Sequence, residues 1–163
     1  PSTHLKVKGK KNIKLIKVDN NSGYEINFKA HDLNFKDIMT NKTFYIQNSN
    51  KFILLDFWGT WCKPCLDLLP NLKSIFKRYG GDKFNIYGIA HDDELSIVKN
   101  HLKSKNVVWP NVFDNRNSAE LVNLYKVQSF PTFILIDPNG KIIYRGIGKS
   151  SLNHIDKILS KLY

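Results

Sequence analysis

Apolar residues with strand-like and helix-like spacing alternate along most of the chain. Phe52–Phe57 is an almost continuous apolar run, which is typical of a central strand covered on both faces. Directly after Cys62 the apolar residues recur at helical spacing and predict a helix to about Tyr79, carrying Leu68, Leu69, Leu72, Ile75 and Phe76. Gly80 and Gly81 end this helix, and Pro70 within it predicts a kink.

The C-terminal half continues the alternation of strands and helices. Asp92 or Asp93 is expected to cap the first of its helices, which carries Leu95, Val98 and Leu102. In chain order we expect a strand at 84–90, that helix, an extended piece at 107–113, a helix at 117–125, strands at 132–136 and 141–145, and a helix at 151–162. Asn139-Gly140 between the last two strands is a strong hairpin signal.

The first fifty residues have strand composition without helical periodicity. Ile13–Val18 and Tyr24–Phe28 alternate in the manner of strands, and residues 19–23 between them have turn chemistry, so we expect a hairpin. Thr43–Ile46 predicts another short strand.

This order of elements predicts an α/β fold with a central mixed β-sheet, helices on both faces and an N-terminal β-hairpin extension. Residues 1–50 would form the mostly β extension, and residues 51–163 the main domain. With 163 residues, 42% of them hydrophobic, the chain can build one sizeable core.

The chain carries a formal net charge of +11, and lysines gather near its start. The cluster comprises Lys6, Lys8, Lys10, Lys11, Lys14 and Lys17. It is compatible with an anionic membrane surface or an acidic partner, but an ordinary solvated face in a lysine-rich protein is the favoured interpretation. No nucleic-acid partner is predicted, because arginine-rich stripes and binding motifs are missing from the sequence.

Both cysteines of the protein, Cys62 and Cys65, lie where the apolar strand gives way to a helix. Two cysteines are too few for a disulfide scaffold or a zinc ribbon, so the pair is redox-active, half of a metal site, or inert. We expect redox activity, with no cofactor and no bound metal. At a helix start, N–H groups and the helix dipole stabilise a thiolate, which is the attacking species in disulfide exchange. We therefore expect Cys62 to be exposed and attacking, and Cys65, one turn on, to be less exposed and to resolve the mixed disulfide.

Three further features near the cysteines point to the same chemistry. Asp56 is an acid inside an apolar strand, where burial would raise its pKa and let it take the proton of Cys65; a structural carboxylate is the alternative. Pro131 opens a later strand, and a cis bond there would present the backbone of Phe130 to an extended substrate. Trp58 is expected in the core, and Trp61 in an apolar landing surface.

The segment Asp56–Cys65, read as Asp-Phe-Trp-Gly-Thr-Trp-Cys-Lys-Pro-Cys, resembles the active-site segment of the thioredoxin superfamily, and within it the TlpA/ResA-like thiol–disulfide oxidoreductases. Similarity extends over about residues 52–160, through Leu69-Pro70, Phe130–Phe133 and Ile136–Lys141. The resemblance implies a thioredoxin-like fold, with the longer spacing before Pro131 accounted for by an insertion at about 93–114.

Carried over, the resemblance makes Cys62 the attacking thiol, Cys65 the resolving thiol, Pro131 the cis proline and Asp56 the buried acid. Trp61, Lys63, Pro64 and Phe130 are expected to contact the substrate. Many relatives keep a glutamate three residues after the second cysteine, whereas this chain has Leu68 there and Asp67 one place earlier. Asp56 is therefore expected to handle the proton instead.

The resemblance also implies a setting. Its members reduce disulfides of protein substrates, receive electrons from an upstream donor and are usually extracytoplasmic, often anchored to a membrane and facing the periplasm. The chain starts at Pro1 rather than Met, so either a targeting segment was removed or the sequence lacks its first part. The membrane anchor that the resemblance implies would lie outside this chain. A cytoplasmic location stays open, since a catalytic cysteine pair works in either compartment.

Three alternative functions remain open at this point. A peroxiredoxin-like peroxidase would need a proline and a threonine placed differently, because Thr60 stands two residues before Cys62. A metal-handling protein would need a histidine near the cysteines, and only His91 is placed for it, while His101 and His154 are expected at the ordinary surface. A binding domain with a purely structural disulfide is the third alternative.

Overall fold

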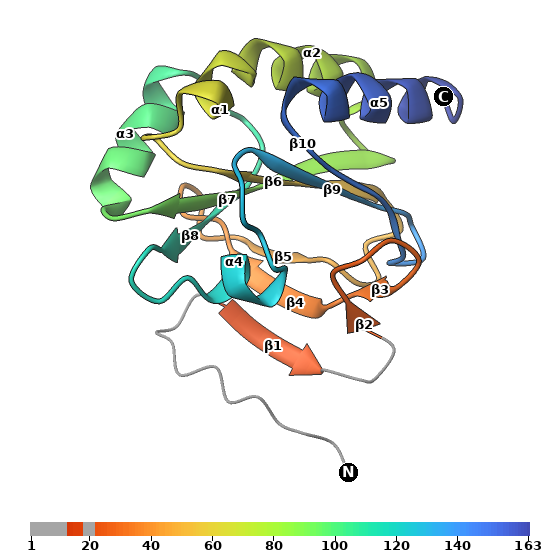
Figure 1. Ribbon diagram of the computed structural model, residues 1–163, viewed down its shortest axis with the longest axis horizontal. Coiled ribbons are helices and arrows are strands. Elements are labelled where there is room, and N and C mark those ends of the chain that lie inside the picture. Colours follow the sequence, from red (N-terminus) through yellow and green to blue (C-terminus); the bar gives the residue numbers. More distant parts are fainter. Residues whose placement is uncertain (1–12, 18–21) are drawn as a thin grey trace.

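The computed structural model describes residues 13–17 and 22–163, and the predicted turn at 19–23 and most of the N-terminal lysine cluster lie outside these ranges or at their edge. The described part of the chain contains ten strands and five helices, with six strands before the first helix (Figure 1). The strands are β1 Ile13–Lys17, β2 Ser22–Gly23, β3 Lys29–Ala30, β4 Asp32–Lys36, β5 Thr43–Tyr45, β6 Phe52–Trp58, β7 Phe84–Asp92, β8 Asn111–Asn115, β9 Thr132–Ile136 and β10 Ile142–Ile147. The helices are α1 Lys63–Asp67, α2 Leu69–Tyr79, α3 Leu95–Ser104, α4 Glu120–Leu124 and α5 Gly148–Ser160.

A five-stranded mixed sheet forms the centre of the molecule, in the order β10-β9-β6-β7-β8. Strands β6, β7 and β8 are parallel to one another. Strand β9 pairs antiparallel with β6, and β10 pairs antiparallel with β9 at the edge of the sheet. The prediction of a central mixed sheet with a parallel part and an antiparallel edge is confirmed. Strand β6, which leads to the cysteines, lies in the middle and is paired on both sides.

The two faces of the sheet are covered differently. Leu54 of β6 points into a core formed with α2 and α5, which lie above the sheet in Figure 1. Ile53, Leu55 and Phe57 point to the other face, where α4 and strand β4 cover them. Helices therefore lie on both faces, as predicted, but the second face is covered mainly by the N-terminal strands. By the period of two in a strand, Asp56 points to the α2 side with Leu54.

The helix after the cysteines is broken, as Pro70 predicted. Leu68 ends α1 and begins α2, with backbone angles near −90° and −5°, and Pro70 lies in the first turn of α2. Proline fits there because a first-turn N–H has no partner within the helix. The break leaves the cysteines on a separate short helix, directed differently from α2 (Figure 1).

The N-terminal part is β structure, but its pairing differs from the predicted hairpin. Strand β1 pairs antiparallel with β4, and β4 pairs with β5, giving a three-stranded sheet. The predicted strand at 24–28 is wrong, because these residues form a bend and a turn in which Asn27 has a φ of 78°. That left-handed conformation interrupts an extended chain, and Ile26 and Phe28 are left exposed.

Two predicted helix starts also need correction. Neither Asp92 nor Asp93 caps α3, because Glu94 holds the cap position and makes no side-chain bond there. Asp92 instead belongs to β7, and its carboxylate accepts a hydrogen bond from the hydroxyl of Thr60. Helix α4 begins at Glu120 rather than at 117, since Ala119 adopts a left-handed conformation that no α-helix can include. The segment proposed as an insertion, 93–114, holds α3 and most of β8.

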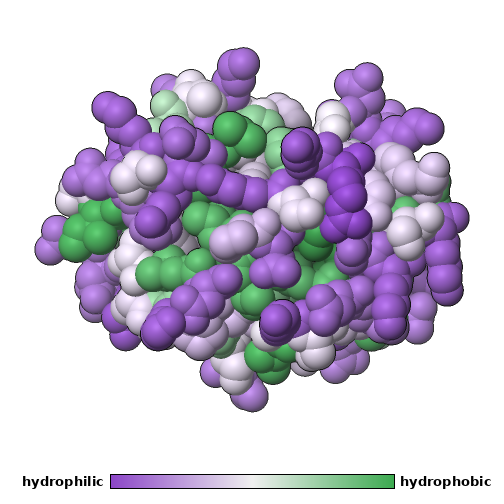
Figure 2. Space-filling view, turned by 90° about the horizontal axis from the view of Figure 1, so that it is seen from above, coloured by the Kyte–Doolittle hydropathy of each residue, from purple (hydrophilic) through white to green (hydrophobic). Residues whose placement is uncertain are grey.

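Viewed from the side of α1, α2 and α5, the surface is mostly polar with small apolar patches between the charged side chains (Figure 2). None of the helices in the described ranges has the length and apolar character that a membrane span requires.

Gly88 of β7 is the partner of Asp56 in the sheet, and its missing side chain makes room for Asn111. A Cβ at Gly88 would lie 1.9 Å from Oδ1 of Asn111, which is fully buried and accepts a hydrogen bond from Nε1 of Trp58. We expect Gly88→Ala to lower the free energy of unfolding by about 1–3 kcal/mol, the usual cost of overpacking. Urea denaturation measures this change.

A double-mutant cycle tests the cause of that loss. If the Asn111 side chain is the obstacle, Gly88→Ala combined with Asn111→Ala should be less destabilised than the sum of the two single variants. Strict additivity would show that the alanine at 88 acts through some other contact.

Candidate active site

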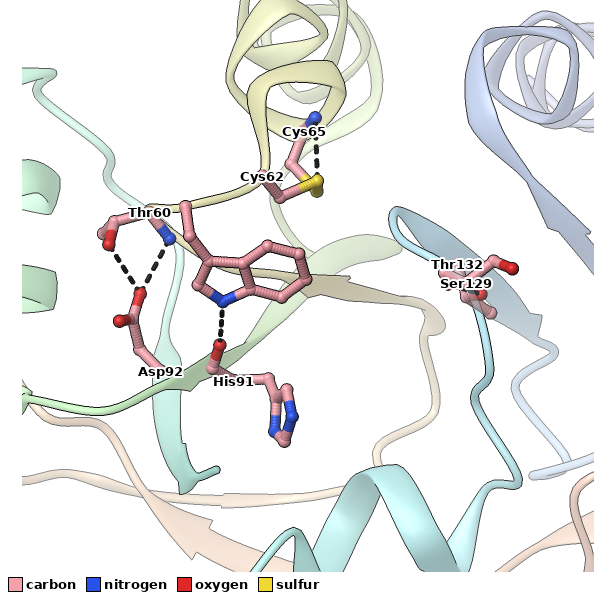
Figure 3. Close-up of a disulfide and its surroundings, with 8 residues drawn as sticks. Thr60, Cys62, Cys65, His91, Asp92, Ser129 and Thr132 are labelled. Atoms are coloured by element: carbon pink, nitrogen blue, oxygen red, sulfur yellow. Dashed lines mark hydrogen bonds between the residues drawn. A yellow bond between two sulfur atoms is a disulfide. The ribbon is translucent and has the colours of Figure 1, made fainter. Parts of the chain in front are cut away.

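The cysteines form a disulfide at the junction of β6 and α1. Cys62 is the N-cap of α1, and its Sγ accepts a hydrogen bond of 3.3 Å from the backbone N–H of Cys65 (Figure 3). The S–S distance is 2.09 Å. When the bond is reduced, the same N–H is placed to stabilise a thiolate at Cys62, as an accepted hydrogen bond favours the charged form. The geometry thus distinguishes the two sulfurs chemically.

Exposure does not distinguish them, contrary to the expectation from sequence. Cys62 is 4% exposed and Cys65 is 6% exposed, so both are buried. They pack in one apolar cluster with Trp58 of β6, Ala90 of β7 and Val98 of α3. The role of Cys62 as the attacking thiol therefore rests on its N-cap position and the bond from Cys65, rather than on greater access.

The end of β7 holds the loop that leads into Cys62. The buried carboxylate of Asp92 accepts hydrogen bonds of 2.7 Å from both the backbone N–H and the hydroxyl of Thr60 (Figure 3). Nε1 of Trp61 donates to the backbone carbonyl of His91 at 2.8 Å. Gly59 is required for this approach, since a Cβ there would lie 2.3 Å from Nε1 of Trp61. Three consecutive residues before Cys62 are thereby held in place.

Trp61 is the exposed aromatic residue of the site, with 46% of its surface accessible. Its ring meets the ring of Phe130 edge-to-face at 5.2 Å, and Phe130 in turn stacks on His91 at 5.4 Å. The guanidinium of Arg116 lies over Trp61, 5.0 Å from the ring centre. Trp61 and Phe130 thus form one continuous apolar surface, as a landing surface for a substrate requires.

The Phe130–Pro131 peptide bond is cis, as predicted. The turn is held on both sides, since the hydroxyl of Thr132 donates to the carbonyl of Ser129 at 2.6 Å and the N–H of Gly148 donates to the carbonyl of Pro131 at 3.0 Å. Within the described ranges, no residue hydrogen-bonds to the backbone of Phe130. Its N–H and C=O are therefore available to an extended segment.

Lys63 and Pro64 stand between the cysteines and are both exposed. The ammonium of Lys63 pairs with the carboxylate of Asp67 one turn later, at 2.7 Å. Because both partners are largely in solvent, the pair contributes little to stability, but it draws the positive charge of Lys63 to Asp67. Asp67 is accordingly engaged in an ion pair at the surface. Leu68 is buried in the core with α2 and α5.

Asp56 is buried beside the disulfide without a counter-charge. It is 4% exposed, no hydrogen bond to its carboxylate occurs in the described part of the chain, and burial raises its pKa to about 7. Asp56 and Cys65 line the same narrow cavity of about 20 Å³, which has room for one water molecule. A carboxyl that titrates near neutrality is suited to accept and release a thiol proton.

Sequence reasoning missed two residues of this cavity. Asn111 comes from β8 and joins Trp58 through a hydrogen bond of 2.9 Å. His101, expected at the ordinary surface, lines the cavity from α3, with its ring 5.4 Å from that of Trp58. Neither carries a local signal, because only the packing of α3 and β8 against β7 brings them to the cysteines. His154 is exposed, as expected, and its ring stacks on Tyr144.

The metal-handling alternative gains no support from His91. Its Nδ1 lies 3.3 Å from the buried carboxylate of Asp114, and its ring is covered by Phe130. Across the residues with described positions, no group of three histidine, cysteine or acidic side chains is arranged to hold a metal ion.

Comparisons with known proteins agree with this geometry. The profile of a thioredoxin-like family matches residues 50–142. The thiol–disulfide oxidoreductase ResA of Bacillus thuringiensis subsp. konkukian (strain 97-27) is 32% identical over 136 residues, which is 83% of this chain and 75% of that protein. The ResA protein of Bacillus cereus (strain ZK / E33L) is 30% identical over 112 residues, 69% of this chain and 64% of its own length.

A solved structure gives the same result at the level of the fold. The exposed lipoprotein thioredoxin of Streptococcus pneumoniae strain TIGR4 is 25% identical, with a TM-score of 0.63, over 80% of this chain and 98% of that chain. These similarities favour dithiol–disulfide exchange over the peroxidase, metal-handling and binding-domain alternatives.

The buried carboxyl of Asp56 predicts an unusual pH dependence of stability. Its pKa is about 7 in the folded protein and about 3.8 without burial, so the folded state binds more protons between these values. Stability is therefore fully present below about pH 4 and falls as the pH rises to about 7, with the difference corresponding to at most ~4 kcal/mol. Asp56→Asn should remove this loss and unfold at higher urea concentration than the unmodified protein at about pH 8.

Asp82→Asn serves as the matched control, because Asp82 is an exposed carboxylate that does not line the cavity. The control should keep the pH dependence of the original protein. Equal stability of the Asp56→Asn and original proteins at about pH 8 would contradict the assigned burial of an uncompensated charge.

Proposed function

The chain belongs to the thioredoxin-like family, among its ResA-like thiol–disulfide oxidoreductases, and from that membership we propose that it reduces disulfides of protein substrates. The observation that carries the proposal is the Cys62–Cys65 pair at the start of α1, with Asp56 lining the same cavity as Cys65. A structural disulfide would have no need of a buried, uncompensated carboxyl beside it.

The reaction begins at Cys62. Its thiolate, stabilised by the N–H of Cys65, attacks one sulfur of the substrate disulfide. A mixed disulfide forms between Cys62 and the substrate, and the other substrate sulfur leaves as a thiolate that takes a proton from solvent.

Cys65 completes the reaction. Asp56 accepts the proton of Cys65, whose thiolate then attacks Sγ of Cys62. The bond between Cys62 and the substrate breaks, the Cys62–Cys65 disulfide forms, and the second substrate sulfur leaves reduced. The protein has lost two electrons, and an upstream electron donor must supply them before the next cycle.

The charges around the cysteines support reduction rather than oxidation of substrates. A disulfide is strongly oxidising when its reduced form is stabilised by positive charge near the thiolate. Here the ammonium of Lys63 is drawn to Asp67, while Asp56 lies beside Cys65 and the carboxylate of Asp92 binds Thr60. These acidic groups offset the stabilisation that the N–H of Cys65 gives the Cys62 thiolate, and the balance favours a reductant.

A substrate can bind in extended form at the surface beside the disulfide. The unused backbone groups of Phe130 offer strand-like hydrogen bonds, and Trp61 with Phe130 offers an apolar surface next to them. Lys63 and Pro64 are exposed on the neighbouring turn and complete the proposed substrate-contacting set.

The proposed location is extracytoplasmic, in the periplasm or attached to the outer side of a membrane. Resemblance to the ResA-like proteins supports this, as does similarity to a pneumococcal protein that is described as an exposed lipoprotein. An anchor would lie outside this chain, which covers 64% to 75% of the length of the two Bacillus relatives.

Cysteine variants test the division of labour between the two sulfurs. Cys62→Ser should abolish reduction of insulin disulfides, because no attacking thiolate remains. Cys65→Ser should accumulate a mixed disulfide at Cys62 that mass spectrometry detects and dithiothreitol removes. An unimpaired Cys62→Ser protein, or a mixed disulfide carried by Cys65 instead, would refute the assignment.

The role of Asp56 is tested with the reduced protein and dithionitrobenzoate, an aromatic disulfide that releases one coloured thiolate when Cys62 attacks and a second when Cys65 resolves. Asp56→Asn should leave the first release nearly unchanged and slow the second by about 100-fold at neutral pH, as expected for loss of a general base. In the original protein the second rate should rise with pH through about 7, following the pKa of Asp56. Equal slowing of both releases would indicate a distorted site.

A further inference from the structure

Asp56 poses a problem that the proposed function leaves open, because a buried base must pass its proton to solvent before it can act again. The residues between Asp56 and solvent are those that line the cavity shared with Cys65. Seven of them are buried, namely Asp56, Trp58, Cys65, Leu72, Leu102, Trp109 and Asn111. The other four reach the surface in part, namely Leu66, Leu69, His101 and Val107.

Of the lining residues that reach the surface, only His101 can carry a proton. The other three have aliphatic side chains. Among the buried polar residues, the amide of Asn111 is already engaged, as its Oδ1 accepts from Trp58 and its Nδ2 donates to the carbonyl of Trp109 at 3.2 Å. Nε1 of Trp58 is used in the same contact and cannot serve as an acceptor.

The imidazole ring of His101 can accept a proton at one nitrogen and release one from the other. It packs against Trp58 at 5.4 Å, and no hydrogen bond to its ring nitrogens occurs in the described part of the chain. One ring nitrogen of a neutral imidazole accepts a proton while the other donates one, so the ring can pass a proton from one side to the other. The cavity that Asp56 and His101 both line has room for one water molecule.

We propose that His101 is the proton relay of the site, joining the Asp56–Cys65 cavity to solvent through one water molecule. The inference rests on the proposed function and extends it. After resolution, the proton that left Cys65 is on the carboxyl of Asp56. It passes to the water, the water passes one to a nitrogen of His101, and the opposite nitrogen releases one to solvent. Asp56 is then ionised again, and no electrons move in these steps.

The surroundings of His101 keep its ring ready to accept. Burial lowers its pKa, and the positive charge of Lys105 just beyond the same helix lowers it further, while Asp92 at the end of β7 acts in the opposite direction. Trp58 on β6 packs on the ring and carries no charge. Because its pKa is lowered, the ring is mostly neutral at neutral pH.

The two-step release from dithionitrobenzoate tests the relay in the full chain. At about pH 6 most Asp56 carboxyls start protonated, so resolution by Cys65 requires a proton to leave the cavity. At about pH 8.5 Asp56 starts ionised and can accept that proton directly. We expect His101→Phe to slow the second release about 10-fold at the lower pH and to leave it unchanged at the higher pH. Added imidazole should restore the rate of the variant at low pH.

Two further variants separate relay from structure. His101→Gln keeps a polar side chain but cannot be protonated, and should behave like His101→Phe. His154→Phe replaces a histidine that stacks on Tyr144 and does not line the cavity, and should match the original protein at both pH values. Thermal unfolding establishes that each variant is folded.

The results that would overturn the relay are distinct from those that would overturn the proposed function. Rates of His101→Phe equal to those of the original protein at about pH 6, equal slowing at both pH values, or full activity of His101→Gln would each refute the relay. If the original protein itself releases no second thiolate, the proposed function fails first. When the original protein releases both thiolates, the pH dependence of any slowing in the His101 variants reports on the relay.

Discussion

The burial of one uncompensated carboxyl beside a disulfide is the constraint on which the site depends. Asp56 lies in the central strand of the sheet, so neighbours on both sides shield it from bulk solvent. Desolvation raises its pKa to about 7, because among the residues with described positions no cation lies near enough to oppose it. The fold is thus less stable at neutral pH, but it contains a base whose pKa of about 7 suits the transfer of a thiol proton. Such a cost is typical of functional sites.

The rest of the site is positioned by contacts between elements that are distant in sequence. The end of β7 binds the loop before Cys62 through Asp92 and through the carbonyl of His91. Strand β8 supplies Asn111, which fills the space that Gly88 leaves free and binds Trp58. Aromatic contacts link Trp61 to Phe130, on the loop of the cis proline. Each part of the redox site is therefore fixed by a different element of the fold.

Local patterns in the sequence predict the features that depend on local interactions. The apolar run of β6, the broken helix at Pro70 and the hairpin between β9 and β10 follow from spacing and turn chemistry, and all three are found. The predicted strand at 24–28 is wrong because Asn27 takes a left-handed conformation, and alternating composition cannot reveal a single dihedral angle. An acid before a helical run indicates a helix cap, as at Asp92, whereas the actual partner of Asp92 is Thr60, 32 residues away.

By itself the sequence determined the family, the cysteine pair and the acid behind it, because these lie within ten consecutive residues on one strand and one helix. Only the tertiary structure decided how deeply the sulfurs are buried, how far the pKa of Asp56 rises and which histidine joins its cavity. Burial and pKa are properties of everything that surrounds a group, and at Cys65 the surroundings come from α2, α3, β6 and β8 together. His101 shows the difference most clearly, as it is an ordinary helical residue in the sequence and a wall of the redox cavity in the fold.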